Sequence, residues 1–437
     1  MKDNYYDCNM ECISRDLLRH IQSKKFVNMI KNCYKYIPLY KKRLDKLGIE
    51  PRDIKSIDDI SKLPFTYKED LRDSYPFGMF AVPKEELVRI HASSGTTGKQ
   101  TVVGYTKNDI NAWANATARA IVAAGGTRSD YVHISYGYGL FTGGLGLHYG
   151  AEKLGAIAVP VSTGNTERQI TIMQDYGTNI LCCTPSYALY IGETMQDMGI
   201  SSETLKLKAG IFGAEAWTEN MRKQIENILN IKAYDIYGLS EITGPGVAYE
   251  CKDQTGMHIN EDMFYPEVIN PDTGKILPDG EYGELVFTCI GKEALPLIRY
   301  RTKDICKIER KQCSCGRTFI KMSRIKGRTD DMLIIRGINV FPSQIEHVLL
   351  PFGMNTNYRI IVDRINNLDK LEIQIEMSGR LFSNSVGKIE DIESKIAQAI
   401  QSNLNISAKI KLLEPKSIPR VNGKIKKVID KRIQDSI

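Results

Sequence analysis

Short apolar runs that alternate with helical stretches in the middle of the chain constrain its fold more than any other feature. The runs are Tyr131 to Ser135, Ile157 to Val161, Asn179 to Cys183, Ala209 to Phe212 and Ala233 to Tyr237. Amphipathic segments lie between them, and one begins at Thr166 with Gln169 three positions later, as in a capping box. Strands that alternate with helices form a mostly parallel sheet, so the sequence predicts an α/β domain.

The segments on either side of this alternation have a different character. Residues 1–65 show helical periodicity and predict a helical N-terminal lobe. Residues 245–328 contain more glycine, proline and short strand-like runs, which predict a β-rich subdomain. After residue 329 the order strand, helix, two strands, helix and strand predicts a small ferredoxin-like α+β domain. We therefore expect a large N-terminal domain over 1–329 and a small C-terminal domain over 330–437.

Composition and charge narrow the class of protein. Of the 437 residues, 42% are hydrophobic and 25% are charged, which is typical of a folded chain and excludes a disordered or collagen-like one. The net charge of +7 suits anionic small molecules as well as nucleic acid. The N-terminus lacks an apolar signal segment, and the uncharged stretch from Tyr131 to Ala151 is too rich in glycine for a membrane helix. Because the cysteines show no disulfide framework, we expect a cytoplasmic protein without a membrane partner.

The most informative local motif is a run of hydroxyl residues and glycines between two strand-like segments. It reads His91-Ala-Ser-Ser-Gly-Thr-Thr-Gly-Lys99. Small residues let backbone N–H groups approach an anion, hydroxyls add donors, and Lys99 adds charge, so the run can bind phosphate. Its two glycines are too close together for a Walker A loop. Considered alone, the motif fits a plain turn equally well.

Further motifs follow in a fixed order. The segment Tyr234-Asp-Ile-Tyr-Gly-Leu-Ser-Glu241 follows the last α/β strand, where open parallel sheets bind ligands, and its terminal carboxylate could hold a divalent cation. A capped strand-to-helix turn is the alternative. The other motifs are Gly213-Ala-Glu215, Arg299-Tyr-Arg-Thr-Lys-Asp304, Gly327-Arg-Thr-Asp-Asp331, Arg336-Gly-Ile-Asn339 and Pro419-Arg-Val-Asn-Gly-Lys424.

Taken together and in this order, these motifs resemble those of the adenylate-forming acyl-CoA ligase superfamily over nearly the whole chain. The resemblance implies a ligase that activates an aryl acid with ATP as an acyl-adenylate, releasing pyrophosphate. Coenzyme A then displaces AMP. The implied cofactors and substrates are ATP, Mg²⁺, coenzyme A and a small carboxylic acid, and the chain would form a homodimer. A ligase for a different aryl acid or a different acceptor is the nearest alternative.

The resemblance also assigns roles to residues at matching positions. The triphosphate would be held by Ser93, Ser94, Gly95, Thr96, Thr97 and Gly98. The remaining nucleotide-binding residues would be Gly213, Ala214, Glu215, Asp235, Tyr237, Gly238, Ser240, Asp304 and Arg328. Glu241 would hold the magnesium ion, and Asp304 would accept from the ribose hydroxyls. The common form of the latter motif has glycine where this chain has Lys303, which leaves the local backbone geometry open.

The resemblance gives Lys424 a role in the first step only. Its ammonium would bridge the substrate carboxylate and the α-phosphate, and would move away when the C-terminal domain, which the resemblance implies to be mobile, turns about a hinge near Asp330. An ordinary solvated lysine in the basic tail is the alternative. The uncharged segment 135–144 would line the acyl pocket, where Tyr136 and Phe141 can enclose an aromatic ring. Structural packing of these two side chains is the alternative.

A separate set of residues has the composition of a zinc site. Cys251 and His258 are followed by Cys313 and Cys315, and three thiols with one imidazole suit tetrahedral Zn²⁺. Four protein ligands leave no open position, so the ion would be structural. A zinc-ribbon nucleic-acid binder would use the same residues with the basic tail. We expect no nucleic-acid partner, because the basic residues are not interleaved with aromatic ones.

Overall fold

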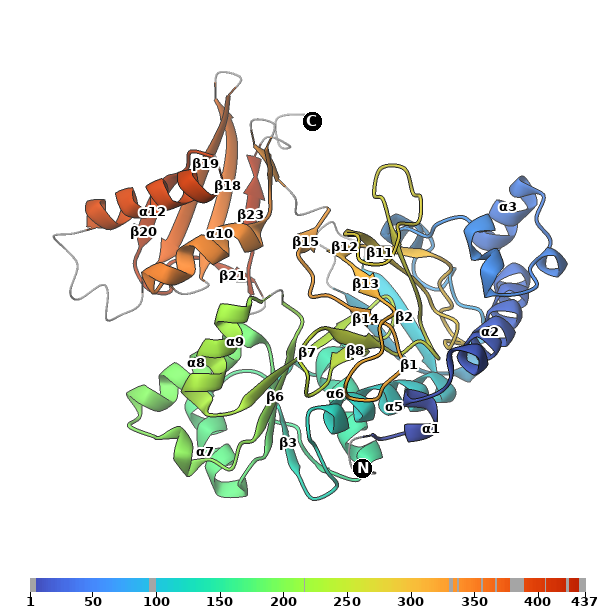
Figure 1. The fold of residues 1–437 in the computed structure, drawn as a ribbon, viewed down its shortest axis with the longest axis horizontal. Helices are drawn as coiled ribbons and strands as arrows, with labels where there is room; N and C mark the ends of the chain where they lie inside the picture. The colour runs from blue at the N-terminus through green and yellow to red at the C-terminus, as the bar shows by residue number, and fades with distance from the viewer. Residues whose placement is uncertain are drawn as a thin grey trace. The chain divides into compact units, whose positions relative to one another are not determined.

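The structure is a computed structural model that describes residues 5–93, 100–215, 217–329, 333–335, 338–354, 357–365, 368–377, 389–404, 406–421 and 424–431. The chain divides into two compact units. The first contains Met1–Glu215 and Met221–Arg324, and the second contains Ala216–Asn220 and Ile325–Ile437. Figure 1 shows both units coloured along the chain. The domain limits expected at residues 329 and 330 remain a prediction.

The N-terminal lobe of the first unit is helical, as expected. Its α-helices are α1 (Cys8–Glu11), α2 (Arg15–Tyr36), α3 (Pro38–Leu47) and α4 (Lys68–Asp73). Helix α2 starts where the Ser14 side chain accepts from the Leu17 backbone N–H. It ends before Pro38, which is the first residue of α3 and cannot continue a helix as a hydrogen-bond donor.

The parallel sheet predicted for the middle of the chain is confirmed. Its strands, β4 (Ile157–Val159), β3 (Tyr131–Ile134), β5 (Ile180–Cys183), β6 (Ala209–Gly213) and β7 (Lys232–Leu239), lie side by side in this order. All adjacent pairs among them are parallel. Every residue of β5 is buried, which explains why its sequence is a continuous apolar run rather than an alternating one.

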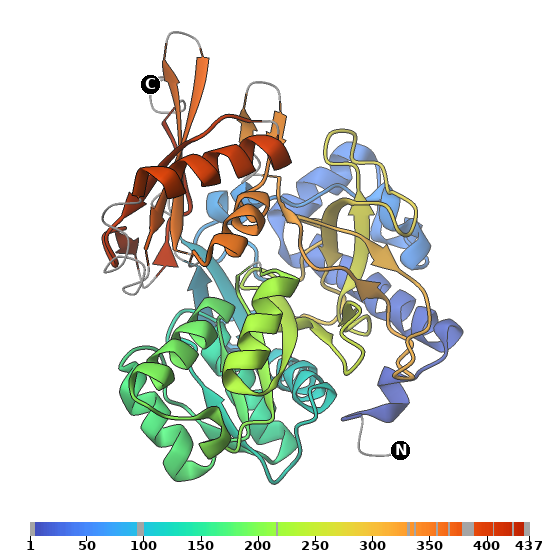
Figure 2. The ribbon, with the colours of Figure 1, turned by 60° about the vertical axis from the view of Figure 1, so that its left-hand side comes forward.

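Helices cover this sheet on both faces. They are α5 (Lys107–Ala123), α6 (Gly143–Leu154), α7 (Thr166–Tyr176), α8 (Pro185–Asp197) and α9 (Glu219–Leu229). Helices α5 and α6 pack against each other on one face, and α7 and α8 lie side by side on the other (Figures 1 and 2). The sheet therefore has the two covered faces that parallel strands require.

The capping box predicted at the start of α7 is wrong. The N-cap is Asn165, whose side chain accepts from the Arg168 backbone N–H. Gln169 is buried instead, and its amide donates to the carbonyls of Ser162 and Gly164. A glutamine three residues after a hydroxyl can cap a helix or reach into the interior, and here its amide oxygen accepts from the buried Ser135 hydroxyl at 2.5 Å.

The regular structure of residues 245–328 consists of strands, as predicted, and part of them extends the parallel sheet. Strands β8 (Gly244–Glu250), β9 (Met257–Ile259), β14 (Lys321–Met322) and β13 (Ile308–Glu309) continue it beyond β7 as antiparallel neighbours. Strands β10 (Tyr265–Ile269), β11 (Gly283–Thr288) and β12 (Tyr300–Cys306) pair antiparallel in another sheet. A two-stranded sheet is formed by β1 (Leu87–Ser93) and β2 (Thr101–Thr106).

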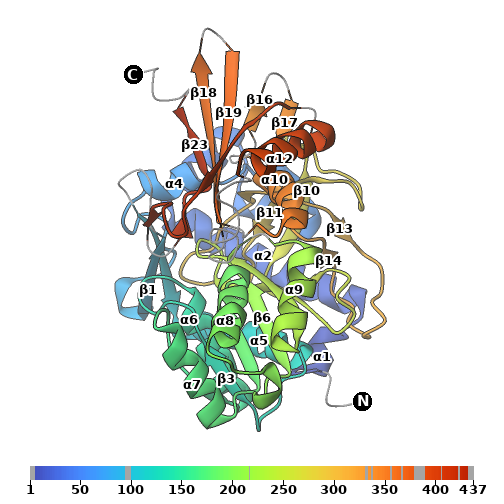
Figure 3. The ribbon, with the colours of Figure 1, turned by 90° about the vertical axis from the view of Figure 1, so that its left-hand side faces the viewer.

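The second unit is a small α+β fold. Its sheet has the order β20 (Lys409–Leu413), β19 (Leu368–Glu376), β18 (Tyr358–Ile365) and β23 (Val428–Asp430). Helices α10 (Pro342–Leu349) and α12 (Ile389–Leu404) lie together on one face of it (Figure 3). The strand expected first in this unit, β16 (Leu333–Ile335), pairs with β17 (Ile338–Val340) as a hairpin, and β23 takes the parallel place beside β18.

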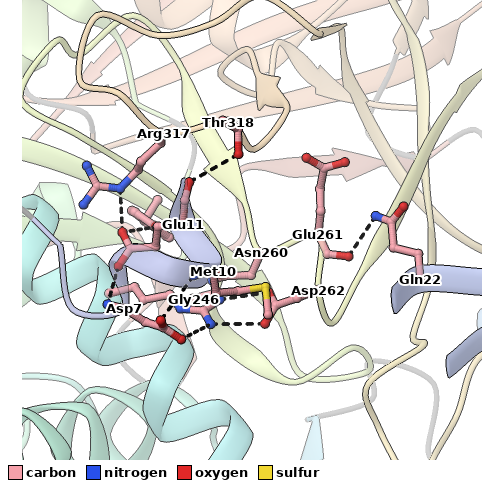
Figure 4. Close-up of polar contacts among 12 residues, drawn as sticks. Asp7, Met10, Glu11, Gln22, Gly246, Asn260, Glu261, Asp262, Arg317 and Thr318 are labelled. Carbon is pink, nitrogen blue, oxygen red and sulfur yellow. Dashed lines mark hydrogen bonds and ion pairs between the residues drawn. The ribbon is translucent and has the colours of Figure 1, made fainter. Parts of the chain in front are cut away.

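Residues of the first two helices, α1 and α2, form polar contacts with later parts of the first unit (Figure 4). The Glu11 carboxylate accepts from Arg317 Nε at 2.7 Å and from the Tyr249 hydroxyl at 3.2 Å. Gln22 donates to the Glu261 carbonyl at 3.0 Å, and Arg119 binds both carboxylate oxygens of Asp262. The first helices are thereby held to Tyr249, Glu261 and Arg317 by a buried ion pair and by hydrogen bonds. Within the described residues, no helix is both long and apolar enough to cross a bilayer.

Candidate active site and metal cluster

The end of β7 is held in place by a buried carboxylate. Glu250, the last residue of β8, accepts from the Asp235 backbone N–H at 2.8 Å. Both of its oxygens also accept from Arg222 of α9, at 2.8 and 2.7 Å, and both side chains are almost fully buried. Asp235, predicted to bind the nucleotide, is itself buried. The sequence-based reasoning did not select Glu250, although an acidic residue at the end of an otherwise uncharged strand was a usable signal.

Two of the predicted nucleotide-binding side chains touch. The Tyr237 hydroxyl on β7 donates to Asp304 Oδ2 at 2.5 Å, and Asp304 is buried on β12. The contact joins strands from two different sheets. A carboxylate held by one phenol keeps further acceptor capacity, so it can accept from a vicinal diol.

The backbone conformation of Lys303 shows how a lysine is accommodated where the common form of this motif has glycine. Lys303 has φ = 68°, the left-handed conformation that glycine adopts without strain. The β11–β12 register slips at this point, which marks a bulge. Thr302 Oγ1 donates to the Leu285 carbonyl and accepts from the Asp304 backbone N–H, which fixes the bulge. The lysine therefore keeps the backbone geometry of the common glycine.

The Gly213-Ala-Glu215 motif forms the end of β6. A side chain at Gly213 would meet the Ile236 carbonyl at 2.2 Å, so the close approach of β6 and β7 requires glycine there. Ala214 has φ = 65° and turns the chain away from the sheet. The Glu215 carboxylate accepts from the Ser186 hydroxyl at 2.7 Å, at the start of α8.

The two residues predicted for the acyl pocket differ in environment. Tyr136 is 4% exposed and follows β3, whereas Phe141 is 39% exposed. Burial raises the pKa of Tyr136 well above its ordinary value. The hydroxyl lies near the Gly213 backbone and makes no hydrogen bond within the described residues. The Phe141 ring packs closely against the first turn of α6. A Cβ atom added at Gly143 would lie only 2.3 Å from this ring.

Glu241 lies in the turn between β7 and β8 and is 5% exposed. Lys68 Nζ, at the start of α4, lies 3.1 Å from Glu241 Oε1. Lys68 was not selected from the sequence, because it stands far from every motif and only the fold brings it here. A half-exposed ammonium beside a buried carboxylate suits a site for phosphates and a divalent cation.

Two further residues of this segment have clear local roles. A side chain at Gly238 would lie 1.7 Å from the Gly244 carbonyl, so the sharp return from β7 to β8 requires glycine. The Ser240 hydroxyl lies 3.1 Å from the Thr142 hydroxyl at the start of α6. This contact joins the turn that contains Glu241 to the predicted acyl-pocket segment 135–144.

Several predicted residues lie wholly or partly outside what the structure describes. Ser94, Gly95, Thr96, Thr97 and Gly98 are among them, as is Asp330. For Ser93 and Lys424 only the backbone is described. Ser93 pairs with Thr101, so the hydroxyl motif connects two adjacent antiparallel strands. Lys424 begins β22 (Lys424–Ile425), and Arg328 ends β15 (Gly327–Arg328), both in the second unit.

The four predicted metal ligands form one buried cluster. Ligand atoms of Cys251, His258, Cys313 and Cys315 all lie within 4.8 Å of one another. Cys251 Sγ lies 3.8 Å from Cys313 Sγ, and Cys315 Sγ lies 3.4 Å from His258 Nε2. Tetrahedral zinc with Zn–S bonds of about 2.3 Å sets its sulfur ligands about 3.8 Å apart, whereas a disulfide needs about 2 Å. The donor set and its spacing therefore fit a closed tetrahedral zinc site.

The histidine of this cluster is oriented by its other ring nitrogen. His258 Nδ1 lies 3.2 Å from the Phe319 carbonyl, so Nδ1 carries the proton and Nε2 faces the thiols. Hydrogen bonding with Cys251 lowers the pKa of Cys315, and the same contact raises that of Cys251. Cys251 directly follows Glu250, so the metal cluster and the anchor of Asp235 are neighbours on the chain.

Comparison with known proteins defines the class. The AMP-binding enzyme family matches residues 42–290, and the AMP-binding enzyme C-terminal domain matches residues 337–432. The chain belongs to the AMP-binding enzyme family. A solved structure of 2-hydroxyisobutyryl-CoA ligase in the postadenylation state with an acyl-AMP has a TM-score of 0.90 at 27% identity, covering 99% of this chain and 93% of that one. The open conformation of the same ligase with 2-HIB-AMP and CoA gives 0.72.

More similar sequences make the family more specific. The phenylacetate-coenzyme A ligase of Thermus thermophilus is 46% identical over 98% of this chain and 99% of its own length. Those of Pseudomonas putida and Escherichia coli are 49% and 47% identical, each over 97% of this chain. The relatives confirm the adenylate-forming ligase class predicted from the motifs.

The Lys303 bulge gives a first prediction. We expect Lys303→Gly to keep the KM for ATP within twofold, because glycine adopts the same φ without strain. Lys303→Val should raise that KM about tenfold and lower the unfolding free energy by about 1–2 kcal/mol, because a β-branched residue resists the left-handed region. Lys307→Val, just after β12, is the matched control and should change neither value. An unchanged KM for ATP in Lys303→Val would show that the bulge does not position Asp304.

Proposed function

We propose that this protein ligates phenylacetate, or a closely similar aryl acid, to coenzyme A at the expense of ATP. The reaction would proceed through an acyl-adenylate with release of pyrophosphate and then AMP. The observation that carries the proposal is the contact of Tyr237 on β7 with Asp304 from another sheet, in the same short segment that contains Asp235 and Glu241. The phenylacetate-CoA ligases at 46–49% identity support the choice of acid over the hydroxy acid of the 27% identical relative.

The first step joins two anions, the carboxylate and the α-phosphate of ATP. Such a step needs positive charge and hydrogen-bond donors where charge builds up, more than it needs a base. The hydroxyls and backbone N–H groups of residues 93–98 would hold the triphosphate. Asp304, already fixed by Tyr237, would accept from the ribose hydroxyls, with Arg328 as a further nucleotide contact. The adenine ring would lie against residues 213–215, where the chain turns away from β6.

Magnesium would be held by Glu241. The site fits a hard cation because it offers a buried carboxylate, and the bound ion would neutralise phosphate charge. Lys424 would contribute its ammonium to the meeting of carboxylate and α-phosphate. In the second step the thiol of coenzyme A displaces AMP, and a turn of the C-terminal domain about Asp330 would withdraw Lys424 before that attack.

The acid would bind beside Tyr136. This side chain is buried next to the Gly213 turn, so one wall of the acyl pocket and one wall of the nucleotide site share a backbone segment. A flat apolar wall favours an aromatic ring, and Phe141 would close the pocket from its exposed side. The fixed position of Tyr136 would orient the acid for attack.

Zinc at the cysteine–histidine cluster would be structural. Four buried protein ligands leave no coordination position for a substrate, so the ion would join β8, β9 and the Cys313–Cys315 turn. A homodimer and a cytoplasmic location complete the proposal.

A panel of acids tests the proposed reaction. We expect kcat/KM to be at least tenfold higher for phenylacetate than for hexanoate or 2-hydroxyisobutyrate, measured as pyrophosphate release with coenzyme A present. Tyr136→Ala should reduce this ratio about tenfold, because the flat wall is lost, while Tyr136→Phe keeps the ring and should keep the ratio. A ratio at or below one would contradict the aryl pocket. Adenylation without thioester formation would contradict coenzyme A as the acceptor.

Elemental analysis tests the metal. Protein purified without added metal should contain about one zinc per chain, and Cys313→Ser with Cys315→Ser should remove it and lower the melting temperature. Cys306→Ser changes a buried thiol outside the cluster and should keep the zinc. Zinc-free protein of full stability, or normal zinc content in the double variant, would contradict the site.

A further inference from the structure

A buried lysine that no motif contains lies behind the turn that carries Glu241. Lys292, between β11 and β12, is 6% exposed. Its Nζ donates to the Ile242 carbonyl at 2.9 Å and lies 4.2 Å from the centre of the Tyr105 ring. The residue after Glu241 is thus bound directly by an ammonium group inside the protein.

Two carbonyls that follow, one in the turn and one at the start of β8, accept from buried aromatic side chains. The Tyr105 hydroxyl on β2 donates to the Thr243 carbonyl at 2.7 Å, and Trp113 Nε1 on α5 donates to the Pro245 carbonyl at 2.8 Å. The Tyr105 and Trp113 rings are stacked 5.3 Å apart. Side chains from three separate elements therefore fix residues 242–245.

The cost of burying an ammonium group here is offset by a local carboxylate. Asp109 is buried and accepts from the backbone N–H groups of Glu293 and Ala294 at 2.7 and 3.0 Å, which fixes the backbone next to Lys292. Burial lowers the pKa of Lys292 to about 8, against the attraction of Asp109, Cys289 and Glu241. A methionine would fill a similar space without the cost of burying a charged group. We therefore attribute the lysine at this position to the hydrogen bond that its ammonium donates to the Ile242 carbonyl.

We propose that Lys292 is a positioning residue for the adenylation step, which holds the Ile242 carbonyl so that the Glu241 carboxylate is aimed at the metal–triphosphate. The inference rests on the proposed role of Glu241. Lys292 itself touches no substrate, because it reaches the turn from inside the protein. Without its bond the Ile242 carbonyl loses its charged donor, and the neighbouring carboxylate can turn further toward Lys68, which already lies 3.1 Å away.

If Lys292 positions Glu241, its replacement should change the Mg²⁺ requirement and should not change the binding of the acid. In Lys292→Met, the Mg²⁺ concentration that gives half-maximal pyrophosphate release should rise about tenfold, while the KM for phenylacetate stays within twofold. Calorimetric titration should show that the binding of Mg²⁺–ATP is weakened by the same factor. The matched control is Lys25→Met, which removes another lysine that donates to a backbone carbonyl, that of Asp262 at 2.6 Å. It should leave the Mg²⁺ requirement unchanged even if it lowers stability.

A second variant keeps the test decisive if Lys292→Met does not fold. Tyr105→Phe keeps the ring but removes the bond to the Thr243 carbonyl, and it should raise the Mg²⁺ requirement about threefold without changing the KM for phenylacetate. An unchanged Mg²⁺ requirement in the folded variants, or an equal rise in both constants, would overturn the role of Lys292. Glu241→Gln separates the two levels, because a wild-type Mg²⁺ requirement in that variant would instead refute the proposed role of Glu241.

Discussion

The bond between the Glu250 carboxylate and the Asp235 backbone N–H is the interaction on which the proposed nucleotide site depends most. Strand β7 is the last parallel strand of its sheet, and β8 returns beside it in the opposite direction. The register slips between Tyr237 and Gly238, so the regular ladder does not by itself fix the residues that follow. Glu250 fixes β7 just before that slip, at the residue whose position sets Tyr237 and the turn to Glu241.

The strength of this anchor comes from its burial. Glu250 and Arg222 form a paired contact with almost no exposure to water, so each group would be costly to leave alone. Removing one partner of such a pair typically costs about 3–5 kcal/mol, while the intact pair adds little net stability over an apolar pair. The main effect of the pair is therefore to fix the position of the Glu250 carboxylate, rather than to add net stability. Cys251 follows Glu250 directly, so a metal bound at the cluster would hold the same strand end from its other side.

The parts of the fold that the sequence could predict are those in which local pattern decides. The five apolar runs became β3 to β7, because parallel strands are buried on both faces and leave a continuous apolar signature. The cluster of Cys251, His258, Cys313 and Cys315 could also be found, since few other arrangements use that set of donors. Motif order indicated the ligase class before any geometry was known.

Long-range contacts account for what the sequence could not predict. Lys68 and Lys292 stand in no motif, and each reaches the Glu241 turn only because separate elements meet there. Gln169 could equally have capped its helix, and hydrogen-bond partners from distant parts of the chain, such as the buried Ser135, decided the outcome. Leu333–Ile335 was predicted as the first strand of the C-terminal unit, whereas it pairs with β17 in a separate two-stranded sheet, because strand pairing is not encoded in local periodicity. Lys303 keeps a glycine-like φ that only its hydrogen-bonded neighbours explain.

The affinity of the protein for ATP in Glu250→Gln tests this account most directly. Calorimetric titration of the folded variant should show at least tenfold weaker ATP binding and unchanged phenylacetate binding, although Glu250 is not proposed to touch either molecule. Asp262→Asn is the matched control, because it weakens another buried bidentate pair, with Arg119, and should leave ATP binding unchanged. Wild-type ATP affinity in a folded Glu250→Gln variant would contradict the claim that this carboxylate positions the nucleotide site.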